Sequence, residues 1–419
     1  MGLPTAEKFE AIQLPLMQEL IRHHPTYGSV SQQACAQLIH NTLADNGWSS
    51  SIIDKYTAME LVGEPDYVPV SEFGADYEGD ADRTKSNVYG VVDSGTEGPT
   101  IILNGHYDVD VVSDPHLWSA PGGWKSGLVA DGNIFGRGAT DMLGGLTSLI
   151  AVGSYFAEIK DEWKGRIILC TVTDEEIGGN GTVQSFKALE RLGYLASADI
   201  VGLIAEPTSG IIADESLGFM HMKLVANRKS QHMGTAQRTN NSLYDMIDVI
   251  TNFDEIASAA VDSMASRTDS SLIHNFGIIN GGQDAAIPIG EVHSEATIFY
   301  PANIAKSGLE KAIAAQLSQR FGIVIAAEFS DFGFRGHKSP DSQFGSILQG
   351  TSTSESVTRG SFKSPCDARI FSTYGVPDVT IFGPGMLEDA HSIDERIELS
   401  LLQNYNQHLV RAISEVLKK

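Results

Sequence analysis

The stretch TIILNGHYD at residues 100–108 shows the pattern on which the fold prediction rests. An apolar run rich in isoleucine and leucine ends in polar residues, here a histidine and an aspartate. The same pattern returns in RIILCTVTDEE at residues 166–176 and in IVGLIAE at residues 200–206. Short continuous apolar runs of this kind are typical of strands that are buried on both faces of a largely parallel sheet.

A helical pattern from Asp141 to Glu158 lies between the first two of these strands. Strands that alternate with a helix favour an α/β fold, and ligands of such sheets bind at the carboxyl ends of the strands. His106, the pair Glu175-Glu176 and Glu206 all end or follow a predicted strand. The pattern therefore predicts a site at that edge of the sheet.

Outward from these strands, the sequence predicts a discontinuous domain. Residues 1–216 and 335–419 carry the strands of the α/β domain, with two N-terminal helices between Ala6 and Asn46 and an acidic loop near 65–85. Residues 217–334 follow the order β-α-β-β-α-β, which is typical of a ferredoxin-like α+β unit. We expect a mostly parallel mixed sheet, interrupted in sequence by this inserted α+β domain.

Element boundaries follow from the apolar periodicity. In the insertion, the predicted strands are 221–227, 272–279, 292–300 and 323–329, and the predicted helices are 241–256 and 304–320. After the insertion, short apolar runs are expected at 365–372 and 378–382, and a closing helix at 400–417.

Composition excludes several classes of partner. The 419 residues hold 29 Lys and Arg against 53 Asp and Glu, a net charge of −24, which disfavours binding to nucleic acid or to an anionic membrane. No apolar stretch approaches the roughly 20 residues of a membrane span. Three scattered cysteines, Cys35, Cys170 and Cys366, do not suit a disulfide framework. We expect a cytoplasmic protein whose partner is a small-molecule substrate.

The residue types at the strand ends indicate a metal site. His106 and Asp108 are two apart, so on a strand they point to the same side, whereas the adjacent Glu175 and Glu176 diverge. Asp141 follows a glycine-bracketed turn and is expected to open a helix. Imidazole and carboxylate without thiolate suit Zn, Mn or Co in a hydrolytic site. A bridging carboxylate would hold two such ions roughly 3.5–4 Å apart.

From about residue 85 onward the sequence resembles the M20 metallopeptidases and deacylases, a family that includes glutamate carboxypeptidase, acetylornithine deacetylase, succinyl-diaminopimelate desuccinylase and aminoacylase-1. The resemblance rests on six motifs in the order of that family. They are GHYDV (105–109), GRGATDM (136–142), TDEEIGG (173–179), AEPT (205–208), DAR (367–369), and FGPG (382–385) with AHS (390–392).

The resemblance implies roles for these residues. It implies that the metal ligands are His106 and Glu206 for one ion, Glu176 and His391 for the other, and Asp141 as a bridge between them. Asp108 would orient the imidazole of His106, and Glu175 would act as general base and acid. The family pattern also implies one or two divalent ions per subunit, with Zn first and Mn or Co as alternatives.

The inserted domain matches the lid of this family, which commonly forms a homodimer interface. His232 stands at the position of the lid histidine that stabilises the oxyanion, within its own chain or across a dimer. Arg369, Phe299 and Gly385 are expected to contact the substrate.

Two departures from the family concern substrate recognition. Ala285 stands where an asparagine is frequent, and Phe299 where an arginine is frequent. An aromatic side chain cannot form a bidentate ion pair with a carboxylate. Either Arg359, Lys363 or Arg369 takes over the recognition of anions, or the substrate is not a simple acidic N-acyl amino acid.

Three functions remain open on the sequence alone. The first is a metal-dependent hydrolase that cleaves the amide bond of a small N-acyl amino acid-like or peptide-like substrate. The second is an aminohydrolase or amidase of the same family that acts on an atypical, aromatic amine or amide. The third is a catalytically silent binding protein, against which the complete ligand set and Glu175 both argue.

Overall fold

The computed structural model describes residues 3–69, 82–197, 199–264, 272–339, 342–354 and 357–418. The chain forms two compact units. Unit 1 comprises Met1–Glu215, Ser339–Phe362 and Cys366–Lys419. Unit 2 comprises Ser216–Lys338 and Lys363–Pro365, so it interrupts unit 1 in the sequence.

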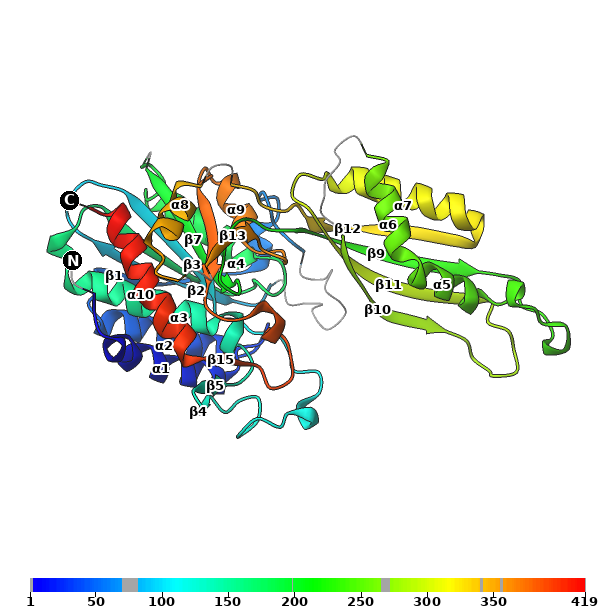
Figure 1. The fold of residues 1–419 in the computed structure, drawn as a ribbon, viewed down its shortest axis with the longest axis horizontal. Helices are drawn as coiled ribbons and strands as arrows, with labels where there is room; N and C mark the ends of the chain where they lie inside the picture. The colour runs from blue at the N-terminus through cyan, green and yellow to red at the C-terminus, as the bar shows by residue number, and fades with distance from the viewer. Residues whose placement is uncertain are drawn as a thin grey trace. The chain divides into compact units, whose positions relative to one another are not determined.

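An eight-stranded sheet forms the centre of unit 1 (Figure 1). Its strands are β1 (Ser50–Tyr56), β2 (Lys85–Asp93), β3 (Thr100–His106), β6 (Arg166–Val172), β7 (Ile200–Pro207), β8 (Ile211–Glu215), β13 (Thr358–Ser361) and β14 (Val379–Gly383). They lie in the order β1-β2-β6-β3-β7-β14-β8-β13. The pairs β3–β6, β3–β7, β7–β14 and β8–β13 are parallel, whereas β1–β2, β2–β6 and β8–β14 are antiparallel. The predicted mixed sheet is therefore confirmed.

Helices cover both faces of this sheet. One apolar cluster contains residues of α1 (Ala6–His23), α2 (Ser31–Asp45), α3 (Gly144–Glu158), α8 (Gln343–Thr351) and α10 (Leu399–Val416). The other contains residues of α4 (Asn180–Arg191) and α9 (Ala368–Thr373). Leu103 of β3 belongs to the first cluster and its neighbour Ile102 to the second. Because successive side chains point to opposite faces, the strand needs apolar residues at every position.

A small second sheet in unit 1 joins two segments that are distant in sequence. Its strands are β4 (Leu128–Ala130), β5 (Asn133–Phe135) and β15 (Arg396–Glu398), in the order β15-β5-β4. β15 pairs antiparallel with β5, and Arg396 lies opposite Phe135. This pairing brings the chain that follows β5 alongside the chain that precedes β15.

Unit 2 is an antiparallel sheet in the order β10-β11-β9-β12 with helices (Figure 1). Its elements are β9 (Gly218–Asn227), α5 (Ser242–Thr251), α6 (Phe253–Asp262), β10 (Ile273–Gly281), β11 (Glu291–Tyr300), α7 (Lys306–Phe321) and β12 (Ile325–Phe334). In β9, Met220, Met222 and Leu224 are buried in one apolar cluster with residues of the helices, while the residues between them are more exposed. This alternation is that of a sheet with one covered face.

Several predicted elements differ from the structure. The helix expected at 241–256 is two helices, because the chain leaves helical geometry at Asn252, whose side chain donates to the carbonyl of Asp248. The apolar run expected to resume the strands at 365–372 is largely the helix α9. β1 and β2 were not anticipated, and residues 70–81 of the predicted acidic loop lie outside the described residues. Within the described residues, no helix combines the length and apolar character needed to cross a membrane.

Candidate metal centre

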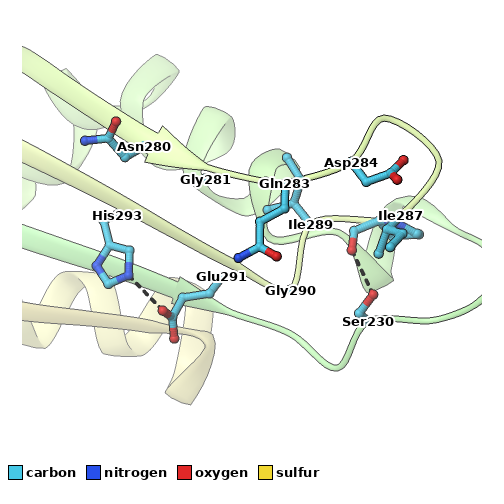
Figure 2. Close-up of a pocket in the computed structure, with 12 residues that line it drawn as sticks. Ser230, Asn280, Gly281, Gln283, Asp284, Ile287, Ile289, Gly290, Glu291 and His293 are labelled. Carbon is cyan, nitrogen blue, oxygen red and sulfur yellow. Dashed lines mark hydrogen bonds and ion pairs between the residues drawn. The ribbon is translucent and has the colours of Figure 1, made fainter.

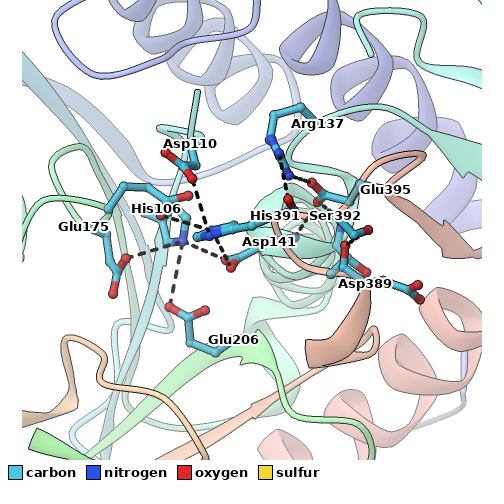
Figure 3. A network of polar contacts seen from close by, with 12 residues as sticks. His106, Asp110, Arg137, Asp141, Glu175, Glu206, Asp389, His391, Ser392 and Glu395 are labelled. Carbon is cyan, nitrogen blue, oxygen red and sulfur yellow. Dashed lines mark hydrogen bonds and ion pairs between the residues drawn. The ribbon is translucent and has the colours of Figure 1, made fainter. Parts of the chain in front are cut away.

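The carboxyl ends of the strands in unit 1 bring the predicted ligands together (Figure 3). His106 is the last residue of β3, and Glu206 lies in the neighbouring strand β7. Glu175 and Glu176 follow β6, the other neighbour of β3, and His391 lies in the loop after β14. Because β3, β6, β7 and β14 run parallel, their ends meet at one edge of the sheet, as the sequence predicts.

Asp141 lies between the two histidines. Its Oδ1 is 3.2 Å from Nε2 of His106, and its Oδ2 is 3.4 Å from Nε2 of His391. The expectation that Asp141 opens a helix is wrong, since its backbone is non-helical (φ −117°, ψ 100°) and α3 begins at Gly144. Each carboxylate oxygen therefore faces a different imidazole, as a bridging ligand requires.

The two adjacent glutamates diverge toward different histidines. Oε2 of Glu176 is 3.2 Å from Nε2 of His391, whereas Oε2 of Glu175 is 3.9 Å from Nε2 of His106. Oε1 of Glu206 is 3.8 Å from the same nitrogen of His106. Two sets of ligand atoms each lie within 4.8 Å of one another: His106, Glu175 and Glu206, and His106, Asp141 and Glu176.

The tautomer of His106 is set by a main-chain group. Nδ1 of His106 donates to the backbone carbonyl of Asp108 at 2.8 Å, whereas the Asp108 carboxylate is 3.7 Å away. The structure thus differs from the expected carboxylate contact: the carboxylate of Asp108 instead accepts the backbone N–H of Glu176 at 3.3 Å. Because Nδ1 is committed to this carbonyl, Nε2 is the ring nitrogen of His106 that faces Asp141 and the glutamates and that could bind a cation.

Burial and crowding shift the pKa values of the site. Burial raises the pKa of Glu175 and of Glu206 well above the ordinary glutamate value, and neighbouring carboxylates add to the shift. Burial likewise raises the pKa of Asp108 to about 8. The charge of Glu176 raises the pKa of His391 to about 12. A cation bound among these crowded carboxyl groups would favour their charged forms and so oppose the upward shifts.

Unpaired buried oxygens support the fit of a divalent cation. Among the described residues, Oε1 of Glu176, Oε1 of Glu206 and Oδ1 of Asp108 are buried and make no hydrogen bond. Leaving such atoms unpaired costs free energy, which a coordinated ion would offset. Carboxylate and imidazole donors without thiolate are the set that Zn, Mn and Co accept in hydrolytic sites.

The structure adds residues that the sequence did not single out. Oδ2 of Asp110 is 3.5 Å from Nδ1 of His391 (Figure 3). Arg137 and Glu395 form a buried ion pair beside Asp141 and His391. Arg137 lies in the motif GRGATDM, but the sequence predicted no role for it. Glu395 lies four residues after His391 and belongs to no motif that would have marked it.

The expected substrate residues of unit 1 have different surroundings. Arg369 is 1% exposed and donates to the carbonyl of Gly178, in the turn after Glu176, so its guanidinium is buried within unit 1. Arg359 makes an ion pair with Asp214. Gly385 lies in the loop after β14 with a positive φ of 99° that favours glycine.

His232 and Phe299 belong to unit 2. His232 is exposed, and its Nδ1 accepts the backbone N–H of Gly234. Phe299 packs against Phe219, with ring centroids 6.2 Å apart, and Phe219 stacks on Phe334 at 5.4 Å. Position 299, where the family pattern has an arginine, thus carries an aromatic ring that belongs to a cluster of three.

A cavity of about 440 Å³ lies in unit 2 (Figure 2). The loop from Gly282 to Gly290 lines it together with Ser230, whose hydroxyl donates to the carbonyl of Pro288. This contact ties the loop that contains Ala285 to the segment that leads to His232. Two of the three positions that the resemblance singled out in the insertion, His232 and Ala285, are thus on linked segments.

Known proteins are similar to this chain in sequence and in fold. The family model described as peptidase family M20/M25/M40 matches residues 102–415. Succinyl-diaminopimelate desuccinylase from Bradyrhizobium sp. (strain ORS 278) is 31% identical over 163 residues, which are 37% of this chain and 41% of the desuccinylase. The chain thus matches only about two fifths of the length of that relative.

Two further comparisons cover more of the chain. N-formyl-4-amino-5-aminomethyl-2-methylpyrimidine deformylase from Bacillus subtilis (strain 168) is 24% identical over 340 residues, or 74% of this chain and 77% of the deformylase. The fold is similar to that of the M20 family metallo-carboxypeptidase Sso-CP2 from Sulfolobus solfataricus, with a TM-score of 0.66 and 14% identity. That similarity covers 96% of this chain and 98% of the carboxypeptidase.

Proposed function

Because this chain belongs to peptidase family M20/M25/M40, we propose that it hydrolyses the amide bond of a small N-acyl amino acid-like or peptide-like substrate with the help of divalent cations. The observation that carries the proposal is the position of Asp141, whose two oxygens face the imidazoles of His106 and His391. Buried carboxylates surround both histidines.

The resemblance to the family, together with this arrangement, supports a role for each residue. His106 and Glu206 would hold one cation, Glu176 and His391 would hold the other, and Asp141 would contribute to both. Bound divalent cations polarise the amide carbonyl and acidify water. Glu175 takes a proton from the attacking water and delivers it to the leaving nitrogen. Zn is the proposed cation, with Mn and Co as alternatives that the same donors accept.

A substrate panel tests this proposal. The full-length chain, loaded in turn with Zn, Mn or Co, is assayed on N-acetyl and N-succinyl amino acids, dipeptides and aryl amides. We expect hydrolysis of at least one small amide, loss of that activity on chelation, and its return when the ion is restored. Failure to cleave any amide with any of the three ions would contradict the proposal.

A second candidate function is hydrolysis of an aromatic amide or amine derivative. Phe299 cannot pair with a carboxylate, and it lies in a cluster of three aromatic rings with Phe219 and Phe334. The Bacillus relative, which this chain matches over 77% of that relative's length, is named as a deformylase of an aminopyrimidine. The same panel separates the two functions, since kcat/KM that favours aryl amides supports the second candidate and strong turnover of acetylornithine-like compounds opposes it.

We also propose that the protein is a homodimer through unit 2. β10 lies at the edge of its sheet, and Ile278 and Ile279 on it are 48% and 50% exposed. An exposed apolar edge strand is a template for pairing with another chain. A dimer would give His232, which is exposed on unit 2, a route to the site of a partner chain.

We expect light scattering to give twice the chain mass, and the double substitution Ile278→Lys and Ile279→Lys to give the monomer mass. Charges at an edge strand oppose pairing between edges. Ile323→Lys is the matched control, because Ile323 is fully exposed in unit 2 but lies outside β10. A monomeric wild type, or a dimer that persists in the double variant, would rule out this interface.

A further inference from the structure

A buried ion pair supports one side of the candidate metal centre (Figure 3). Nη1 of Arg137 is 2.6 Å from Oε2 of Glu395, and the two residues are 4% and 0% exposed. They are 258 positions apart in the sequence. Taking two charges out of water is costly, so such a pair persists where its geometry and further hydrogen bonds compensate.

Both members of the pair contact residues of the centre through the backbone. Nη2 of Arg137 donates to the carbonyl of His391 at 3.0 Å. Oε1 of Glu395 accepts the backbone N–H of Asp141 at 3.1 Å and that of Thr140 at 2.9 Å. The pair thus links the segment that carries Asp141 to the segment that carries His391.

The small sheet of unit 1 makes this link possible. β5 and β15 pair antiparallel, and beyond them the backbone N–H of Gly136 donates to the carbonyl of Glu395 at 3.0 Å. The chain then leaves regular structure on both sides: Asp141 is non-helical, and His391 has a positive φ of 58°. Neither residue lies in a helix or strand ladder that would fix its backbone.

The other side of the centre is held differently. His106 ends β3 opposite Val172 of β6, and Glu206 lies within β7. The large sheet therefore fixes the backbone of these two residues. The side that contains His391 is held in part by side-chain contacts, and the Arg137–Glu395 pair is a buried one among those that the described residues make.

We propose that Arg137 and Glu395 are positioning residues that set the affinity for the cation that Glu176 and His391 would hold, and that they affect the cation that His106 and Glu206 would hold to a smaller extent, through Asp141 alone. This inference rests on the proposed function, in which both ions are present. Replacing a residue that orients a metal ligand without touching the metal typically lowers metal affinity by about 10- to 100-fold.

Cobalt titration of the metal-free full-length chain tests the proposal. The absorption of Co²⁺ reports each ion as it binds, and His391→Ala identifies which binding step belongs to His391. In Arg137→Lys, a single ammonium cannot span the contacts to Glu395 and to the His391 carbonyl. We expect that step to weaken about 10- to 100-fold in Arg137→Lys and in Glu395→Gln, and the other step to weaken clearly less.

Arg166→Gln is the matched control. Arg166 also makes an ion pair in unit 1, with Asp93, but it stands at the amino end of β6, away from the strand ends that carry the ligands. The double variant Arg137→Met with Glu395→Gln removes both buried charges, so it remains informative where a single variant leaves one charge unpaired and fails to fold.

Three outcomes overturn the inference, and two of them, unselective binding by the variants and weakening in Arg166→Gln, leave the proposed function standing. If the wild type binds two ions and the variants bind both as tightly, or lose both equally, the pair does not act selectively on the His391 side. A wild type that binds a single ion overturns the two-ion centre, and this inference falls with it. Weakening in Arg166→Gln of the same size would also contradict a specific role for the pair.

Discussion

Replacing Glu175 with glutamine is expected to lower the turnover of the best amide substrate by about 10²- to 10⁴-fold, while two divalent ions remain bound. Glutamine keeps the size of the side chain but cannot take a proton from water at neutral pH. Glu175 lies at the edge of the ligand cluster, 3.9 Å from the nearest nitrogen of His106. Kinetics and elemental analysis on the same preparation measure both effects.

The metal content distinguishes proton transfer from ligation. Glu175 belongs to one of the two sets of ligand atoms that lie within 4.8 Å of one another, so it could hold an ion directly. In that case Glu175→Gln would lose metal together with activity. Glu162→Gln, at an exposed glutamate of the same unit, serves as the control for a general effect of removing one charge. Near-wild-type turnover in Glu175→Gln would refute its role as a proton carrier.

Asp141→Asn is expected to reduce bound metal below two ions per chain and to lower turnover by about 10³-fold or more. The two oxygens of Asp141 face two different histidines, so one substitution weakens both halves of the centre. An amide supplies one weaker oxygen ligand and no negative charge. Isothermal titration with Zn²⁺ and steady-state kinetics measure the loss.

Asp110→Asn is the matched control for this experiment. Asp110 also faces His391, but from the opposite ring nitrogen, Nδ1, at 3.5 Å. Its replacement is expected to leave both ions bound and to have a smaller effect on turnover than Asp141→Asn. If Asp141→Asn binds two ions with wild-type affinity, Asp141 is not a shared ligand.

The sequence sufficed for much of the fold and for the cluster of ligands because both depend on local patterns. An apolar run that leads into a polar segment, such as the one with His106 or the one with Glu175, marks the end of a buried strand. Parallel strands then place such ends at one edge, whatever the order of the strands. The mixed sheet and the meeting of His106 with Glu206 follow from that rule.

Other features depend on contacts between distant segments, which no local pattern records. Glu395 forms an ion pair with Arg137, which is 258 residues away in the sequence. The pairing of β5 with β15, two strands of three residues each, brings the two residues together. The carboxylate of Asp108 accepts the backbone N–H of Glu176, which is 68 residues away in the sequence. Nδ1 of His106 donates instead to the backbone carbonyl of Asp108. The burial of Arg369 likewise follows from the tertiary packing of α9.

The position of β14 in the large sheet has a consequence for biosynthesis. β14 lies between β7 and β8, yet it leaves the ribosome only after all of unit 2 has been made. Until then the nascent chain exposes the edges of β7 and β8 to pairing with other chains. Residues 379–383 both complete the sheet and lead to His391, so the candidate metal centre forms only after this late strand has been added.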